Sequence, residues 1–128
     1  MIHLDTSVLV DALTGPRRSA RALRRAIEQG ERILLSTLVV YEWLRGPRSD
    51  EELAAQEALF PRESAVAFGR EEAALAATLY RAVRRPRGRE IDLAVAACAI
   101  THGAQFWTLN SEDFRDVPEL ALFAPGGA

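Results

Sequence analysis

Four short segments of this 128-residue chain place an acidic side chain directly beside an apolar run. They are HLDTS with Asp5, VVYEWLRG with Glu42, REIDLAVAACA with Asp92, and TLNSEDF with Asn110 and Asp113. A carboxylate in apolar surroundings loses hydration, so it is costly unless it is hydrogen-bonded, paired with a cation or bound to a metal ion. These segments are therefore the first candidates for chemistry.

Each acid alone also has a structural explanation. Asp5 and Asp92 lie where helices are expected to begin, and acids are favoured there as caps and as partners of the helix dipole. Glu42 could be an ordinary exposed helical residue, and Asp113 a first-turn acid. Gathered at one edge, the four would repel one another and raise one another's pKa unless a divalent cation neutralised them.

The ligands of such a cluster would be oxygen atoms, because the chain has one cysteine and two histidines that are far apart in sequence. Oxygen ligands select Mg²⁺, with Mn²⁺ as a substitute, rather than zinc. Cys98 lies in the apolar run LAVAACAI and is predicted to pack in the core. His3, in an apolar strand segment, and His102, at a helix C-terminus, are predicted to be structural.

The elements that must position the acids follow from the apolar pattern. Strands are expected at short apolar runs, namely 2–4, 32–36, 65–68, 106–109 and 121–124. Helices are expected where apolar residues recur at helical spacing between Gly, Pro and capping residues, namely 7–13, 17–29, 37–45, 49–59, 70–84 and 91–102, with a short helical turn at 111–114.

Strands that alternate with helices at this spacing predict an α/β fold with a mainly parallel sheet covered on both faces. Ligands of such sheets bind beyond the carboxyl ends of the strands, where Asp5 and Asn110 both lie. If the first strand and the strand at 106–109 are central, all four acids can reach one edge. The length of the chain fits a single domain, 1–128.

Composition excludes several other classes. The net charge is −2 and all 16 basic residues are arginine, so the site lysine of phosphoacceptor receiver domains and of haloacid-dehalogenase-type phosphatases is missing. The longest apolar stretches are far shorter than the roughly 20 residues that cross a bilayer, and no charged leader precedes a short apolar segment. We therefore expect a cytoplasmic protein without a membrane segment.

Two arginine-rich stretches could supply local positive potential to a nucleic acid despite the net negative charge. They are RRSARALRR at 17–25 and RAVRRPRGRE at 81–90. The second leads directly into the Asp92 segment, and Arg89 is the residue we expect to contact RNA phosphates. The alternative for both stretches is a solvated helix face paired with nearby glutamates.

Together the four segments resemble the PIN-domain ribonucleases and, within them, the VapC toxins of prokaryotic type II toxin–antitoxin pairs. HLDTSVLVDAL looks like the opening strand with its aspartate, LLSTLVVYEWLRG is similar to the second acidic motif, IDLAVAACAITHGA to the third, and TLNSEDFRDVPEL to the closing motif. The resemblance covers nearly the whole chain and implies a PIN-like three-layer α/β/α sandwich.

The resemblance implies a metal-binding acidic pocket made by Asp5, Glu42 and Asp92, with Asp113 as the fourth acid. Asn110 stands where some members carry aspartate, and it would be a polar partner, which leaves open whether one or two metal ions bind. The implied reaction is Mg²⁺-dependent hydrolysis of an RNA phosphodiester by metal-activated water.

Thr6 and Ser7 would hydrogen-bond the carboxylates or the scissile phosphate, unless they cap the following helix. The implied partners are an RNA substrate, a small VapB-like antitoxin and a second copy of the chain in a homodimer. Two alternatives stay open: a PIN-fold nuclease that acts on DNA or another nucleic acid, and a PIN-like binding module without catalysis.

Overall fold

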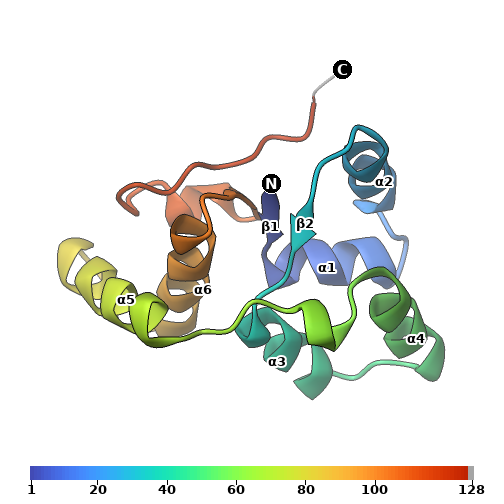
Figure 1. Cartoon of the computed structure of the whole chain (residues 1–128), viewed down its shortest axis with the longest axis horizontal. Coiled ribbons are helices and arrows are strands. Elements are labelled where there is room, and N and C mark those ends of the chain that lie inside the picture. The colour runs from blue at the N-terminus through green and yellow to red at the C-terminus, as the bar shows by residue number, and fades with distance from the viewer. Residues whose placement is uncertain (127–128) are drawn as a thin grey trace.

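A small parallel β-sheet lies at the centre of the computed structural model, which describes residues 1–126 (Figure 1). Its strands are β1 (Ile2–Leu4), β2 (Ile33–Leu34) and β3 (Gln105–Trp107), in the order β2-β1-β3. Both pairings of β1 are parallel. Of the two strands that the sequence analysis took as central, β1 is central, whereas β3 is an edge strand of this three-stranded sheet. The carboxyl ends of the parallel strands meet at one edge of the sheet.

The predicted strand at 65–68 is wrong as a full strand, because it makes only a one-residue parallel bridge between Ser36 and Val66. The segment that contains Ser36 cannot continue this pairing, because helix α3 begins at the next residue, Thr37. The hydroxyl of Thr37 accepts a hydrogen bond from the Phe68 N–H at 3.2 Å in place of a strand carbonyl.

The predicted strand at 121–124 is likewise reduced to one bridge, between Phe106 and Leu122. The strand expected at 106–109 lies at Gln105–Trp107 instead. It ends at Trp107 because its partner β1 ends at Leu4 and the chain enters helix α1 at Thr6. With these two bridges the parallel arrangement extends by one segment at each edge of the sheet.

The helices follow the apolar pattern closely. In chain order they are α1 (Thr6–Leu13), α2 (Ala20–Glu28), α3 (Thr37–Arg45), α4 (Asp50–Leu59), α5 (Arg70–Ala82) and α6 (Glu90–Thr101), with 3₁₀ turns η1 (Arg62–Ser64) and η2 (Ser111–Phe114). Helix α4 begins with a capping box in which Ser49 and Glu52 bond each other's backbone N–H groups.

Two predicted helix ends are wrong by two or three residues. The helix expected from 17 begins at Ala20, because Arg17 adopts φ 54°, a left-handed conformation that a helix cannot contain. The helix expected to run to 84 ends at Ala82, because Val83 is extended and turns its side chain into the core.

Helices cover both faces of the sheet and form the predicted three-layer α/β/α arrangement. Figure 1 shows α5 and α6 on one side of the strands and α1, α2 and α4 on the other. Helix α3 contacts both α1 and α6. None of the helices described within residues 1–126 is long and apolar enough to cross a membrane.

The core is built from β1, β3 and the inner faces of α1, α3 and α6. Helix α6 is buried continuously from Leu93 to Ala99, which explains why its sequence shows no polar face. Cys98 lies in this buried run as a free thiol, as predicted. His3 is also fully buried, and its ring packs beside the ring of Phe106 in the core.

Candidate active site

Asp5 lies where β1 ends and α1 begins. Its backbone N–H donates to the carbonyl of Trp107 at 2.8 Å, which carries the β1–β3 pairing one residue further. Its carboxylate accepts hydrogen bonds from the hydroxyls of Ser7 at 2.9 Å and Thr108 at 2.7 Å. Asp5 occupies the N-cap position, but its side chain makes no capping hydrogen bond. The buried carboxylate is therefore held for some purpose other than the cap.

The protonation of Asp5 reflects two opposing effects. Burial raises the pKa of Asp5 above its ordinary value, and the negative charge of Glu42 adds to this. The hydroxyl groups of Thr108 and Ser7 act in the opposite direction, because they donate to the ionised form. Asp5 is thus a carboxylate that lacks solvent and has no basic side chain bonded to it in the described part of the chain.

Thr108 is a site residue that the sequence analysis missed. It is buried, donates to Asp5, and accepts the backbone N–H of Asn110 at 3.0 Å. The reason for the omission is that 106–109 was interpreted as one continuous strand, which left Thr108 as an ordinary strand residue. The available signal is a small hydroxyl residue at the carboxyl end of an apolar strand, the same place in the fold as Asp5.

Glu42 reaches the same region from the middle of α3. The hydroxyl of Thr6 donates to one carboxylate oxygen at 2.6 Å, and the guanidinium of Arg45 lies 3.6 Å from the other. The Glu42 side chain is only 19% exposed, whereas that of Arg45 is 56% exposed. Glu42 is therefore not the freely solvated helical residue of the alternative explanation. Thr6 and Ser7 each hold one of the acids, as the sequence suggested.

Asp92 lies in the first turn of α6 and shows the strongest sign of crowding among the acids. Its pKa is raised to about 6, first by burial and then by the negative charges of Asp5, Glu42 and Asp113. The guanidinium of Arg89 lowers the pKa of Asp92 in part. Acids from three other parts of the fold therefore lie close enough to Asp92 for their charges to act on it.

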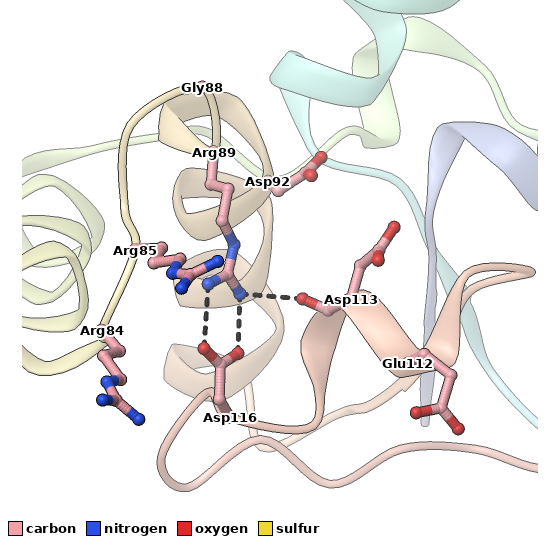
Figure 2. Close-up of a pocket in the computed structure, with 8 residues that line it drawn as sticks. All are labelled: Arg84, Arg85, Gly88, Arg89, Asp92, Glu112, Asp113 and Asp116. Atoms are coloured by element: carbon pink, nitrogen blue, oxygen red, sulfur yellow. Dashed lines mark hydrogen bonds and ion pairs between the residues drawn. The ribbon is translucent and has the colours of Figure 1, made fainter.

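Asp113 and Asn110 come from the segment after β3. Asn110 is the N-cap of η2, and its carbonyl accepts the Asp113 N–H at 2.9 Å. Both side chains are exposed. Figure 2 shows the carboxylates of Asp92 and Asp113 on the same side of the pocket, whereas Glu112 points away from them. The structure thus brings Asp113 to the other acids and gives Asn110 a backbone role in shaping the turn.

Arg89 connects the two elements that carry Asp92 and Asp113. Its guanidinium donates two hydrogen bonds to the carboxylate of Asp116, at 2.9 and 2.7 Å, and one to the carbonyl of Asp113 at 2.8 Å (Figure 2). Arg89 immediately precedes α6, and Asp116 follows η2. The guanidinium that the sequence analysis assigned to RNA phosphates is therefore engaged within the protein.

A pocket of about 660 Å³ opens between these elements. Figure 2 shows Asp92 and Asp113 on one side and Arg84 and Arg85 on the other, with Arg89 and its partner Asp116 between them. Asp5 and Glu42 lie outside the lining, yet their charges act on Asp92. The pocket has an acidic wall and a basic wall, with the Arg89–Asp116 ion pair between them.

The donor set fits a hard divalent cation, because every candidate ligand is an oxygen atom. Within residues 1–126, however, no three histidine, cysteine, aspartate or glutamate side chains form a ready-made metal cage. Mg²⁺ is commonly held by one or two carboxylates together with water and substrate phosphates, so it does not require such a cage. Burial and the negative charges of Asp5, Glu42 and Asp113 raise the pKa of Asp92, and a cation bound beside these acids would offset their repulsion.

Comparison with known proteins identifies relatives of this chain. Residues 2–120 match the family described as PIN domain. The protein named Ribonuclease VapC19 from Mycobacterium tuberculosis, in strain CDC 1551 / Oshkosh and in strain H37Rv, is 37% identical over 122 residues, which cover 91% of this chain and 94% of the relative.

Solved structures share the same fold at lower sequence identity. VapBC2 from Rickettsia felis bound to a promoter DNA fragment aligns with a TM-score of 0.73 at 20% identity, covering 96% of this chain and 98% of that one. FitAcB from Neisseria gonorrhoeae aligns at 0.71 and 21% identity, covering 98% of each chain. A toxin–antitoxin complex from Klebsiella pneumoniae aligns at 0.73 and 20% identity, also covering 98% of each chain.

Proposed function

The chain belongs to the PIN-domain family and, within it, to the VapC ribonucleases, and from this premise we propose that it is a Mg²⁺-dependent endoribonuclease and the toxin of a VapBC-type pair. Mn²⁺ would substitute for Mg²⁺. The proposed unit is a single PIN domain spanning 1–128, whose substrate is an RNA phosphodiester.

The observation that carries this proposal is the gathering of three other acids around Asp92. The pKa of Asp92 is raised to about 6 by burial and by the charges of Asp5, Glu42 and Asp113. A folded protein keeps such repulsion when the site has a use for it, and a divalent cation is the ligand that would relieve it. Helix caps alone would leave these acids solvated and apart.

The chain's own residues divide the work. Asp5 and Asp92 would be the main metal ligands, and Ser7 and Thr108 hold the Asp5 carboxylate in one orientation by donating to it. Glu42, fixed by Thr6, would position the attacking water. Asp113, placed by the turn that Asn110 begins, would complete the acidic set.

The metal ion, when bound, supplies the lowered pKa of the attacking water and charge stabilisation for the phosphate oxygens. The protein then needs no nucleophile of its own. Cys98 is consistent with this, because burial raises the pKa of its thiol to about 11 and it is enclosed in the core. A thiolate mechanism is therefore not proposed.

We also propose that a small VapB-like antitoxin holds the protein inactive and that the protein forms a homodimer in the cytoplasm. The solved relatives from Rickettsia felis and Klebsiella pneumoniae are described as a VapBC complex and a toxin–antitoxin complex. Helix α3 exposes Tyr41 and Leu44, and α4 exposes Leu59, so apolar surface is available for such contacts. Analytical ultracentrifugation of the chain alone checks the dimer, and a purely monomeric protein would contradict it.

The decisive test is cleavage of total RNA by the purified protein with Mg²⁺ or Mn²⁺, beside the same reaction in EDTA. Asp5→Asn and Asp92→Asn are the site variants. Asp50→Asn is the matched control, because Asp50 is an exposed acid in the first turn of α4. We expect discrete products from the parent and the control, and none from the site variants or in EDTA.

Other outcomes separate the alternatives. Cleavage of single-stranded DNA in preference to RNA of the same sequence would assign the chain to the other nuclease class. Cleavage that continues in EDTA would refute metal dependence. Absence of both cleavage and Mn²⁺ binding, followed by the paramagnetic signal of Mn²⁺, would favour a binding module without catalysis.

A further inference from the structure

The basic wall of the 660 Å³ pocket is not explained by the acidic cluster. Arg84 and Arg85 line it on the side opposite Asp92 and Asp113. Figure 2 shows the Arg85 side chain directed toward Arg89, with Arg84 at the outer edge. Both arginines are exposed, and neither takes part in an ion pair within the described residues. Their positive charge therefore remains available to a ligand.

The backbone that carries these arginines is fixed at both ends. Val83, directly before them, is only 6% exposed and anchors the end of α5 in the core. Directly after them, the Arg89 N–H donates to the Pro86 carbonyl at 2.9 Å, closing a turn in which Gly88 has φ 82°. Proline and a glycine with positive φ are the residues that such a turn favours. The arginines thus project from a pre-organised segment.

The neighbouring guanidinium has a different role. Arg89 is 21% exposed and is held by Asp116 and by the Asp113 carbonyl. An incoming phosphate would have to displace a bidentate carboxylate to reach Arg89, whereas at Arg84 and Arg85 it would meet unpaired guanidinium groups. Within the segment 81–90, the pocket side therefore offers two free cations and one engaged cation.

We propose that Arg84 and Arg85 form a subsite for the RNA backbone phosphates adjacent to the scissile bond. The inference rests on the proposed nuclease function and deepens it. Asp92 and Asp113 repel a phosphate except where a cation neutralises them, so the flanking phosphates are placed on the opposite wall of the same pocket. The two walls together would position single-stranded RNA across the acids.

The test measures RNA binding as a function of salt in an Asp5→Asn background, which prevents cleavage. The probe is a fluorescein-labelled single-stranded RNA in Mg²⁺ buffer, followed by anisotropy. The Arg84→Ala/Arg85→Ala variant is compared with Arg21→Ala/Arg25→Ala, which removes the same charge from exposed positions of α2. Figure 1 places α2 on the opposite side of the molecule from α5 and α6.

Losing two phosphate contacts should make the log–log salt slope less negative by about 1.4, since each contact to a single strand contributes about 0.7. If the effect vanishes near 1 M salt, affinity at about 0.1 M falls by about 25-fold. The α2 control should change the slope little. Arg84→Lys/Arg85→Lys keeps the charges and should restore most of the slope.

Each outcome decides something. An unchanged slope and Kd in the Arg84→Ala/Arg85→Ala variant, with wild-type protein that still cleaves RNA, overturns the subsite and leaves the nuclease intact. An equal loss in the α2 control also overturns the subsite, since it shows a non-specific charge effect. A selective loss in a protein that cuts no RNA supports the subsite and refutes the nuclease. A parent that binds no RNA, together with wild-type protein that cuts none, refutes both.

Discussion

Replacing Asp92 by asparagine should stabilise the metal-free protein at neutral pH. In the folded state the pKa of Asp92 is about 6, against an ordinary value of 3.8. A raised carboxylate pKa means that the folded state binds more protons between these values, so stability is lost as pH rises through this window. Above about pH 6 the whole penalty is present, and below about pH 4 nearly none is. Asparagine has the same shape and no charge at any pH.

The size of the gain follows from the shift and from the exposure of the side chain. A change from 3.8 to about 6 corresponds to about 3 kcal/mol at about 1.4 kcal/mol per pKa unit. Asp92 is half-buried, so solvent screening reduces this to about 1–2 kcal/mol. Loss of an acid from the first turn of α6 costs about 0.3–1 kcal/mol. The net gain is about 1 kcal/mol, or about 4 °C in Tm.

The assay is thermal unfolding in EDTA at about pH 7.5 and about pH 4, with Glu90→Gln as the matched control. Glu90 is an exposed acid in the same first turn of α6, so its variant isolates the cost to the helix dipole. We expect Asp92→Asn to be more stable than wild type at the higher pH, with most of the difference gone at the lower. Mg²⁺ should reverse the order, because only wild type retains the full ligand charge.

An Asp92→Asn protein that melts at or below the temperature of Glu90→Gln in EDTA would refute the reasoning. It would mean that the carboxylates do not repel one another measurably, and that the argument for a cation at this edge fails with it. A gain of equal size at both pH values would refute the electrostatic origin in another way, because packing does not depend on the protonation of Asp92.

Three further predictions concern the surroundings of the acids. Thr108→Val should lower folding stability by about 1–3 kcal/mol and reduce cleavage, because it removes a buried hydroxyl that donates to Asp5 at 2.7 Å. The control is Thr78→Val, which removes an exposed hydroxyl in α5. Full activity of Thr108→Val would contradict this role. Arg89→Ala and Asp116→Ala should each lower the free energy of unfolding by about 1 kcal/mol. In chemical denaturation, the double variant should lose less stability than the sum of the two single losses. Strictly additive losses would count against the ion pair. Burial lowers the pKa of His3 to about 4, so neutral His3 contributes up to about 3 kcal/mol to folding stability. This stability is fully present above about pH 6.5 and is lost as pH falls toward 4. His3→Leu should remove this acid sensitivity, and an unchanged pH profile of unfolding would refute it.

Sequence reasoning succeeded where a local pattern determines the outcome. Asp5 after a three-residue apolar strand, Glu42 in an apolar helix and Asp92 at the start of a buried helix were all found by the same criterion, a charge whose neighbours exclude water. The parallel sheet followed from the alternation of strands and helices. These features depend on residues that are adjacent in sequence, which is why one chain was enough to predict them.

The features that were missed depend on contacts between distant residues. Thr108 becomes a site residue only because Asp5, 103 positions earlier, accepts its hydrogen bond. Arg89 appeared free in sequence, and only the fold shows that Asp116, 27 positions later, holds it. The apolar segment at 65–68 lacks a full partner strand because the segment beside it, which contains Ser36, enters helix α3 at Thr37. The pattern of apolar residues predicts that a strand or helix exists, whereas contacts between distant residues determine its length and its side-chain hydrogen bonds.

The contact between Asp5 and Thr108 also has a consequence for the order of synthesis. Translation delivers Asp5 103 residues before Thr108, so a nascent chain that has not reached β3 lacks the hydroxyl that orients the carboxylate. A partly made chain therefore has no assembled site, whatever its first helices have folded into. Because segments 103 residues apart must meet to build the site, the proposed nuclease cannot act on the ribosome until β3 has emerged and paired with β1.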